Sequence, residues 1–337
     1  MGIIKNLLSL FSGGTGEVRV SEQLLFDKVI GFKGVVDGAG ASTIVQNIAA
    51  ALSDTTHYKI CVIDTNMLYP CQFELLGCSG DNKYDIIDYT RGIKIGEIVN
   101  ESRHGNVSVV GFKDRTVVDL VAVTETLGDF DKLLNELKMF YDIILIDLSH
   151  EPSNFATQAA IKCNKIFMVC DESVKSTSNL IHAYNYITTL GVSLTKCRRI
   201  ILNKTTAINT GIRGTISDLK LEIFGEIPFS EAIYNRGVAG KPFYGMATRD
   251  STITEAHILI EKLRKDIIEE TPLNRKNLKD SKEKHSKETV AEIDFSNEDS
   301  ESIEEPIKEK LTYSEPDVFG KGESQDDVEP VFSDGGE

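Results

Sequence analysis

Short runs of apolar residues alternate with longer amphipathic segments along the chain from Lys28 to about Glu270. The apolar runs are rich in β-branched residues, as is typical of strands that are buried on both faces of a sheet. In the longer segments, apolar residues recur three and four positions apart, which predicts helices with one buried face. The alternation indicates parallel βαβ units. It predicts one doubly wound α/β domain, whose mostly parallel sheet has about seven or eight strands flanked by helices.

Six runs are predicted as strands: KVIGF, KICVID, VSVVGF, DIILID, KIFMVC and RRIILN. Five segments are predicted as helices: residues 42–52, 127–140, 153–163, 176–190 and 253–268. The folded domain is therefore placed at residues 28–270, between two end segments of different composition.

The first end segment covers residues 1–27. Residues 2–12 carry apolar side chains at helical spacings and polar residues on the remaining face, which predicts a short amphipathic helix. Such a helix binds either a membrane surface, as an interfacial anchor, or the protein's own domain or a partner, and the pattern leaves both open. Lys5 is the only basic residue in it, so a membrane contact through residues 2–12 would be weak and reversible.

The second end segment, residues 271–337, is a charged tail. It contains 19 acidic and 9 basic residues and so supplies −10 of the chain's net charge of −15. Its apolar residues are too sparse to bury a core, which predicts disorder. The tail serves either as a partner-binding arm or as a solubilising spacer, and the sequence does not decide between them.

Composition excludes several classes of protein. The chain has 337 residues, of which 41% are hydrophobic, so it is not wholly disordered. The first 272 residues carry a net charge of only −5, and this lack of a basic field gives no indication of a nucleic-acid partner. The six cysteines include no CxxC pair and are expected to be free thiols. With no secretory signal and no run near ~18 apolar residues, we expect a cytoplasmic protein, which the N-terminal helix could bring to the inner face of the membrane.

A phosphate-binding turn is the strongest chemical signal in the sequence. GFKGVVDGAGAST runs from an apolar strand through a glycine-containing turn directly into a helix. Gly38 and Gly40 permit backbone angles that side chains would block. The amides of Gly40, Ala41 and Ser42 lie at the helix N-terminus, which favours an anion. Ser42 stands where a P-loop hydroxyl would reach Mg²⁺, and Thr43 follows it.

The turn lacks the lysine that a standard P-loop places just before this hydroxyl, because Ala41 occupies the position. A tight strand-to-helix turn without any ligand would also favour glycines. This stretch alone therefore leaves both interpretations open.

Two acidic strand ends shift the balance toward phosphate binding. KICVIDTNM ends a strand in Asp64 with Asn66 two residues later, and DIILIDLS ends another strand in Asp147. A carboxylate at the carboxyl end of a parallel strand, beside the turn, is suited to hold magnesium through water. Each aspartate alone is more often the cap that begins a loop.

Taken together and in this order, the motifs of residues 28–270 resemble the MinD/ParA superfamily of P-loop ATPases. VVDGAGAST is similar to its deviant P-loop, VIDTNM to its switch I region and IILIDLS to its Walker B-like strand. RRIILNK is similar to a later strand that ends in asparagine near the adenine. KYDIIDYTRGIKIGEIV and IPFSEAIYNRGVAGKPF resemble the segment after switch I and a late segment near the base.

The resemblance implies a P-loop NTPase fold with ATP and Mg²⁺ as cofactors, and a homodimer as one oligomeric state. It implies that Asp64 and Asn66 lie in switch I and that Asp147 is the Walker B carboxylate, with catalytic roles for these three. Ser42, Asp64 and Asp147 would hold Mg²⁺ indirectly. The residues expected to bind the nucleotide are Gly38, Ala39, Gly40, Ala41, Ser42, Thr43, Asn203 and Pro228.

Alanine in place of the P-loop lysine resembles the TadZ/CpaE branch of pilus-assembly localisation factors. The chain departs further from the superfamily pattern, since Val36 occupies the place of the signature lysine that crosses the dimer interface and Asp37 replaces a glycine. Asn66 also stands where many relatives have a second switch aspartate.

These departures predict a site that binds nucleotide better than it hydrolyses it. Loss of a charge-assisted contact costs roughly 1.5 to 3 kcal/mol, and loss of a cation supplied in trans costs on the order of 10³ to 10⁵ in rate. Asp37 adds a negative charge that should weaken binding further. The first hypothesis is therefore a weak or inactive ATPase that acts as a positional scaffold for a pilus or secretion assembly, with the assembly proteins as partners.

The second hypothesis is an active ATPase, either of ParA type in DNA partitioning or of MinD type in placing the cell-division site. Its candidate DNA-binding cations are Lys196, Arg198, Arg199, Arg213 and Lys220. Such charges usually lie on solvated faces, and we expect no nucleic-acid partner. A dinucleotide oxidoreductase is disfavoured because the turn lacks the GxGxxG spacing. His150 could approach the site, but we expect no catalytic role for it.

Overall fold

The computed structural model describes residues 28–79, 83–113, 130–150, 153–206, 211–247 and 249–269. The predicted N-terminal helix with its linker, 1–27, and the predicted charged tail, 271–337, lie outside these residues. None of the described helices combines the length and the apolar character needed to span a bilayer.

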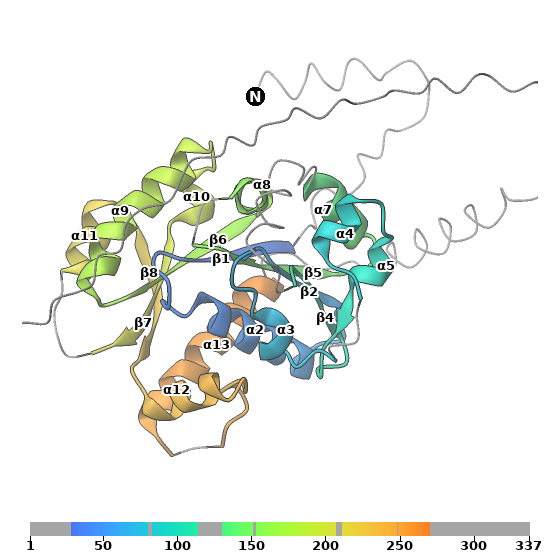
Figure 1. Ribbon diagram of the computed structural model, residues 1–337. Coiled ribbons are helices and arrows are strands. Elements are labelled where there is room, and N and C mark those ends of the chain that lie inside the picture. The colour runs from blue at the N-terminus through green and yellow to red at the C-terminus, as the bar shows by residue number, and fades with distance from the viewer. Residues whose placement is uncertain are drawn as a thin grey trace, which may run out of the picture. The chain divides into compact units, whose positions relative to one another are not determined.

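A sheet of eight described strands forms the centre of the fold, in the order β3-β4-β2-β5-β1-β6-β7-β8 (Figure 1). Neighbouring strands pair in parallel except β3, which is antiparallel to β4. The strands are β1 (Lys28–Gly34), β2 (Ile60–Asp64), β3 (Asn100–Glu101), β4 (Val107–Val110), β5 (Ile143–Leu148), β6 (Lys165–Asp171), β7 (Arg199–Thr205) and β8 (Glu222–Pro228). The predicted doubly wound, mostly parallel sheet is confirmed.

Helices cover both faces of this sheet. Figure 1 shows α2 and α13 on one face and α8 and α9 on the other, and α2 also packs directly on α13. The longer described helices are α2 (Ala41–Thr55), α7 (Phe130–Lys138), α8 (Asn154–Lys162), α9 (Val174–Thr189), α12 (Glu231–Val238) and α13 (Ser251–Glu269). The shorter ones are α3 (Gln72–Leu75), α4 (Ile86–Thr90), α5 (Ile95–Ile98), α10 (Leu194–Cys197) and α11 (Ile212–Asp218).

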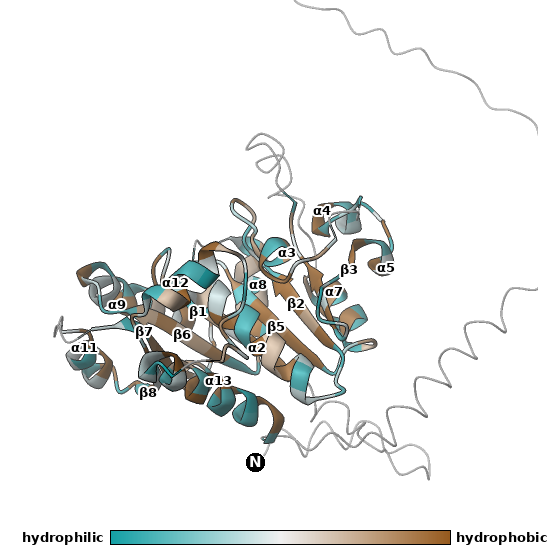
Figure 2. Cartoon of the chain, turned by 90° about the horizontal axis from the view of Figure 1, so that it is seen from below, coloured by the Kyte–Doolittle hydropathy of each residue, from teal (hydrophilic) through white to brown (hydrophobic). Residues whose placement is uncertain are grey.

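The central strands are mostly apolar because helices cover them on both sides, and their few charged residues lie near the strand ends. Every residue of β1, β2 and β5 is buried, and Figure 2 shows these strands as hydrophobic between helices with polar outer faces. β8, at the sheet edge, instead mixes buried and exposed positions. It was not among the runs predicted from the sequence, because an edge strand with Glu222 and Glu226 lacks the apolar signal of a central one.

Strand order determines where a ligand can bind. The chain leaves β1 toward β2 on one side of it and later passes to β6 on the other, so β1 marks the point where the direction of winding changes. In open α/β sheets, ligands bind in the crevice at the carboxyl ends of the strands at such a point. This places the loop after Gly34 and the residues after β5 beside the crevice.

One buried charge lies next to this crevice. Lys33 is only 5% exposed, and its Nζ donates to the carbonyl oxygens of Ser149, at 2.7 Å, and His150, at 3.3 Å. Its ammonium also lies 5.6 Å from the centre of the Tyr186 ring. Burial lowers the pKa of Lys33 to about 8. The side chain thus ties β1 to the segment that follows β5.

This lowered pKa predicts how stability changes in alkaline solution. Between pH 8 and the ordinary lysine pKa, the unfolded chain binds more protons than the folded one, so the free energy of unfolding should rise with pH. The shift corresponds to roughly 3 kcal/mol. Urea unfolding at intervals from pH 7 to 10.5 should show this rise in the wild type and its absence in Lys33→Met. Lys241→Met, at an exposed position, should follow the wild type, and parallel curves for all three proteins would contradict the prediction.

Candidate functional site

The loop between β1 and α2 presents a helix N-terminus at the carboxyl end of the sheet. Gly40 is the N-cap residue of α2, with φ 98°, and it offers no side chain to cap the first turn. Gly38 also has a positive φ, of 74°. Glycine adopts such conformations without strain because it has no Cβ. The amides of the first turn and the positive end of the helix dipole are therefore directed to a ligand that carries negative charge.

Asn203, at the end of β7, holds the loop in place. Its Nδ2 donates to the carbonyl oxygen of Ala39 at 2.8 Å, and its Oδ1 accepts from the backbone amide of Lys204 at 3.0 Å. The approach is close, because a Cβ added at Gly40 would lie 2.2 Å from Asn203 Nδ2. Position 40 therefore requires glycine for two reasons: its backbone angle and the space that Asn203 occupies.

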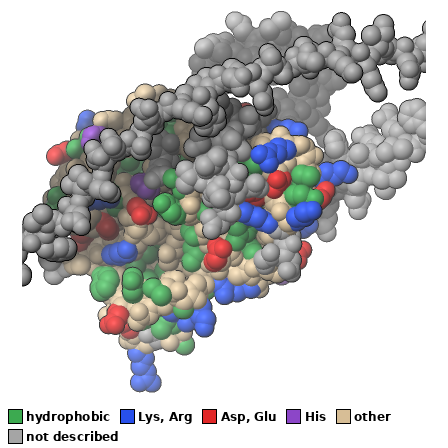
Figure 3. Space-filling model, in the orientation of Figure 1, with side chains coloured by type: hydrophobic (Ala, Val, Ile, Leu, Met, Phe, Trp, Pro, Cys, Tyr) green, Lys and Arg blue, Asp and Glu red, His purple; other side chains and the backbone are tan. Residues whose placement is uncertain are grey.

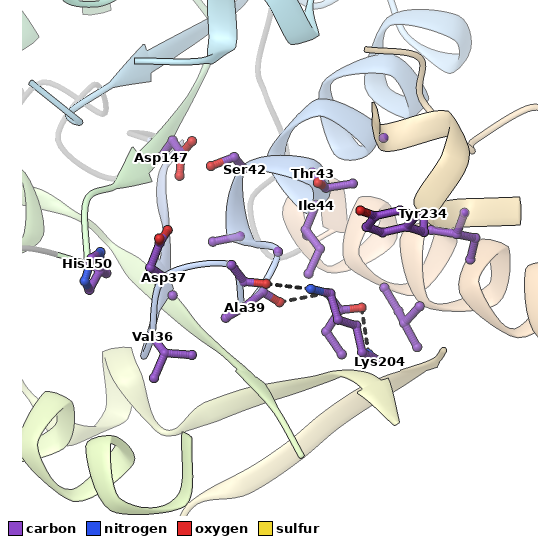
Figure 4. A pocket seen from close by; sticks show the side chains of 18 of the residues that line it. Val36, Asp37, Ala39, Ser42, Thr43, Ile44, Asp147, His150, Lys204 and Tyr234 are labelled. Atoms are coloured by element: carbon purple, nitrogen blue, oxygen red, sulfur yellow. Dashed lines mark hydrogen bonds between the residues drawn. The ribbon is translucent and has the colours of Figure 1, made fainter. Parts of the chain in front are cut away.

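A cavity of about 420 Å³ opens in front of this loop (Figure 4). It is lined by the loop and the first turn of α2, the ends of β5, β7 and β8, and residues of α12. Its volume lies in the range of small-molecule sites. The predicted site residues that line it are Gly38, Ala39, Gly40, Ala41, Ser42, Thr43, Asn66, Asp147, Asn203 and Pro228, whereas Asp64 does not.

Two buried carboxyl groups meet at the polar end of the cavity. Asp147 is 5% exposed, and Figure 4 shows it beside Ser42. Carboxylate oxygens of Asp64 and Asp147 and the Cys71 sulfur all lie within 4.8 Å of one another. Gln72 Nε2 donates to Asp147 Oδ2 at 2.6 Å. The structure thus brings together the strand ends that the sequence singled out.

Asp64 has a structural role in the described fold. It is fully buried, and its Oδ1 accepts from the amide of Asn66 at 2.9 Å. Its Oδ2 accepts from the amides of Cys71, at 2.8 Å, and Gln72, at 3.0 Å. These bonds close the loop that leads from β2 to α3, so Asp64 acts as the loop cap that the sequence left open as an alternative.

The pair of carboxyl groups carries unfavourable charge. Burial and the neighbouring Asp147 raise the pKa of Asp64 to about 7, and burial raises the pKa of Asp147. A divalent cation would relieve this repulsion, and the oxygens of Ser42, Asp64 and Asp147 are the hard donors that Mg²⁺ prefers. Gln72 Oε1, close to this pair, is buried without a hydrogen-bond partner. The residues present therefore fit a magnesium ion.

The opposite end of the cavity is apolar. Pro228 ends β8, and it lines the cavity together with Phe229, Ile233, Tyr234 and Val238. Phe229, Tyr234 and Val238 are more than half exposed. An apolar wall next to an anion-binding turn suits a ligand with a flat apolar part and a negatively charged part. The resemblance placed the segment that contains α12 near the base, but the sequence did not predict which of its residues line the cavity, because they resemble those of any surface helix.

Lys204 was also missed as a site residue, although it stands directly after Asn203 in the motif RRIILNK. Its Nζ donates to the carbonyl oxygen of Gly38 at 2.7 Å. Val36, at the position of the signature lysine, is buried in the hydrophobic core. His150 lines the cavity and is exposed.

Four of the five cations considered for DNA binding have partners within the protein. Arg213 forms a bidentate pair with Glu226, at 2.6 and 2.7 Å. The others pair as follows: Arg198 with Glu222, Arg199 with Asp266, and Lys196 with the carbonyl oxygen of Cys163. On the face in Figure 3, basic and acidic side chains are interspersed. This arrangement does not resemble a phosphate-tracking surface.

We compared the chain with known proteins by sequence. No family model matches the chain. An uncharacterized ATP-binding protein of Methanocaldococcus jannaschii is 25% identical over 236 residues, which cover 65% of this chain and 80% of that protein.

Solved structures of MinD and ParA ATPases share its architecture. The septum site-determining protein MinD of Pyrococcus horikoshii, in complex with Mg-ADP, has a TM-score of 0.61 at 16% identity, covering 73% of this chain and 100% of that one. A ParA family ATPase of Chlorobium tepidum has a TM-score of 0.57 at 18% identity, covering 70% and 98%. The chain therefore has the fold of MinD and ParA P-loop ATPases.

The contact between Gly40 and Asn203 predicts a difference between two glycine substitutions. Gly38→Ala introduces a Cβ into open space at a positive φ and should cost about 1 to 2 kcal/mol of unfolding free energy. Gly40→Ala adds a collision with a hydrogen-bonded amide, so it should cost at least ~1 kcal/mol more. Urea unfolding measures both. Adding Gly40→Ala to Asn203→Ala should cost less than adding it to the wild type, and equal costs in both backgrounds would show that the collision does not matter.

Proposed function

We propose that this protein belongs to the MinD/ParA superfamily, binds ATP with Mg²⁺, and hydrolyses it slowly or not at all. The observation that carries the proposal is the uncapped N-terminus of α2 facing a cavity that also contains a buried pair of carboxyl groups. One feature attracts phosphate and the other attracts a divalent cation. The similarity to an ATP-binding protein and the MinD fold, solved elsewhere with Mg-ADP, support the same ligand.

The proposed roles follow the two ends of the cavity. Residues 38–43 would contact the phosphates through backbone amides. Ser42 and Asp147 would hold magnesium, with Asp64 behind them and Asn66 at the rim. Asn203 and Pro228 would border the base, next to the apolar residues of α12. When bound, magnesium would neutralise phosphate charge and orient the phosphate chain.

Weak hydrolysis follows from the charges that the loop lacks. Ala41 provides no cation, and Val36, which is buried and lines the cavity, provides none either. Positive charge is what stabilises the transition state of phosphoryl transfer. Backbone amides and magnesium supply binding without that cation. We therefore propose that nucleotide acts as a structural or switching ligand.

The biological role proposed for such a protein is that of a positional scaffold for a pilus or secretion assembly, in the manner of the TadZ/CpaE branch. Its partners would be the assembly proteins and a second copy of the chain, with residues 2–12 as a contact to the membrane. One MinD structure is a MinC:MinD complex, which illustrates partner binding by this fold. Neighbouring genes for a secretion ATPase and pilin-like proteins would support this role, and a gene for a centromere-binding protein would favour DNA partitioning.

Nucleotide affinity tests the proposed site directly. Titration calorimetry with ATP should give saturable binding to the wild type that tightens with Mg²⁺. Ser42→Ala should weaken binding about tenfold in the presence of Mg²⁺, because one contact to the ion is lost, and should change little when the metal is chelated. Ser178→Ala, on the exposed side of α9, is the matched control. If the wild type bound ATP with equal affinity with and without Mg²⁺, Ser42 and Asp147 would not have the proposed role of holding the ion.

Turnover tests the second half of the proposal. Purified wild-type protein with Mg-ATP should release phosphate far more slowly than the ~1 to 10³ s⁻¹ typical of enzymes. Phosphate release is measured over hours, with Asp147→Asn as the background. Turnover in the ordinary enzymatic range that disappears in Asp147→Asn would show that the loop catalyses efficiently without its lysines.

A further inference from the structure

The end of β7 is distorted at a single residue. Lys204 has φ 56°, a left-handed conformation that is unusual for a side-chain-bearing residue inside a strand. The pairing of β7 with β8 shifts register between Asn203 and Thr205, so Lys204 is the extra residue of a bulge. Bulges commonly redirect a side chain next to a functional site.

The redirected side chain reaches the phosphate-binding loop. Lys204 Nζ donates to the carbonyl oxygen of Gly38 at 2.7 Å, and Figure 4 shows this bond beside that of Asn203 to Ala39. An ammonium group has three N–H donors, and Gly38 accepts one of them. The contact is exposed, and Asn203 already ties the same loop to β7. An exposed hydrogen bond to a loop that is already held contributes too little to account for the strained backbone.

The charges around the cavity indicate that Lys204 has a role in ligand binding. Among the described residues that line it, Lys204 is the only lysine or arginine. Asp37 and Asp147 line the same cavity with negative charge. An anionic ligand therefore meets one fixed positive side chain, next to the loop whose positions 36 and 41 carry Val and Ala.

We propose that Lys204 supplies the cationic contact to the polyphosphate that the loop lacks at Val36 and Ala41. The inference rests on the proposed nucleotide-binding function and adds the residue that gives this site its preference for ligands with several phosphates. Lys204 would contact the phosphate groups from the end of β7, whereas a P-loop lysine contacts them from within the loop. Lys204 thus raises the affinity for the polyphosphate. It does not replace the cation that a second subunit supplies for hydrolysis.

Lys220 provides a matched control. It has the same φ of 56°, but it follows the C-cap residue of α11, and its amide donates to the carbonyl oxygen of Ser217. A left-handed residue is ordinary at the end of a helix. Lys220 does not line the cavity. Lys220→Met therefore removes the same charge from the same backbone conformation without touching the site.

Affinities for ATP, adenosine and inorganic tripolyphosphate, measured by calorimetry with Mg²⁺, test the proposal. Lys204→Met should weaken ATP and tripolyphosphate binding about tenfold or more and leave adenosine binding unchanged. Lys204→Arg should retain most of the affinity, and Lys220→Met should match the wild type. Lys204→Gln keeps a donor for Gly38 without the charge, so it should behave like Lys204→Met.

Lys204→Gly separates binding from stability. It relieves the left-handed strain, so urea unfolding should show a protein at least as stable as the wild type, while ATP binding is weakened as in Lys204→Met. If wild type and Lys204→Met bind ATP equally, the assignment of Lys204 is wrong and the proposed function stands. If Lys204→Gln binds like wild type, the contact ties the loop only and the assignment is also wrong. If wild type binds neither ATP nor tripolyphosphate, the proposed function itself is wrong.

Discussion

The close approach between Asn203 and the backbone at Ala39 and Gly40 is the constraint on which the site depends. It fixes the first turn of α2 against the end of β7 across strands that are distant in sequence. Because the contact leaves no room for a Cβ at Gly40, the helix begins without a side-chain cap. The amides and dipole of α2 then face the cavity, and every other feature of the site is arranged around that anion-attracting end.

Negatively charged side chains outnumber positively charged ones around the cavity, where Asp37 and Asp147 face Lys204. Two buried carboxyl groups raise each other's energy, and magnesium with a polyphosphate would lower it. The loop contributes backbone dipoles in place of lysine side chains. Binding and hydrolysis place different demands on these groups, since binding needs total charge compensation and hydrolysis needs positive charge at the transferred phosphoryl group. In the proposed function, the backbone amides and the carboxyl pair meet the first demand, and Ala41 and Val36 supply no charge for the second.

Two buried charged side chains outside the cavity support this arrangement. The ammonium of Lys33 is buried beneath the segment that follows Asp147 and bonds its carbonyl oxygens. Asp64 closes the neighbouring loop through three backbone amides. The residues that would contact a ligand are therefore held by polar groups that do not themselves line the cavity.

The sequence alone predicted the architecture, the loop before α2 and the strand ends beside the cavity, for a physical reason. Central strands buried on both faces must be continuously apolar, and a turn that approaches phosphate must carry glycine, so both leave a local pattern that can be recognised along the chain. Long-range geometry leaves no such pattern. Only the tertiary structure showed that Asp64 caps its own loop, that α12 forms the apolar wall, and that a bulge turns Lys204 toward Gly38. Each of these features depends on contacts between separate strands, helices and loops. The order of residues within one segment does not reveal such contacts.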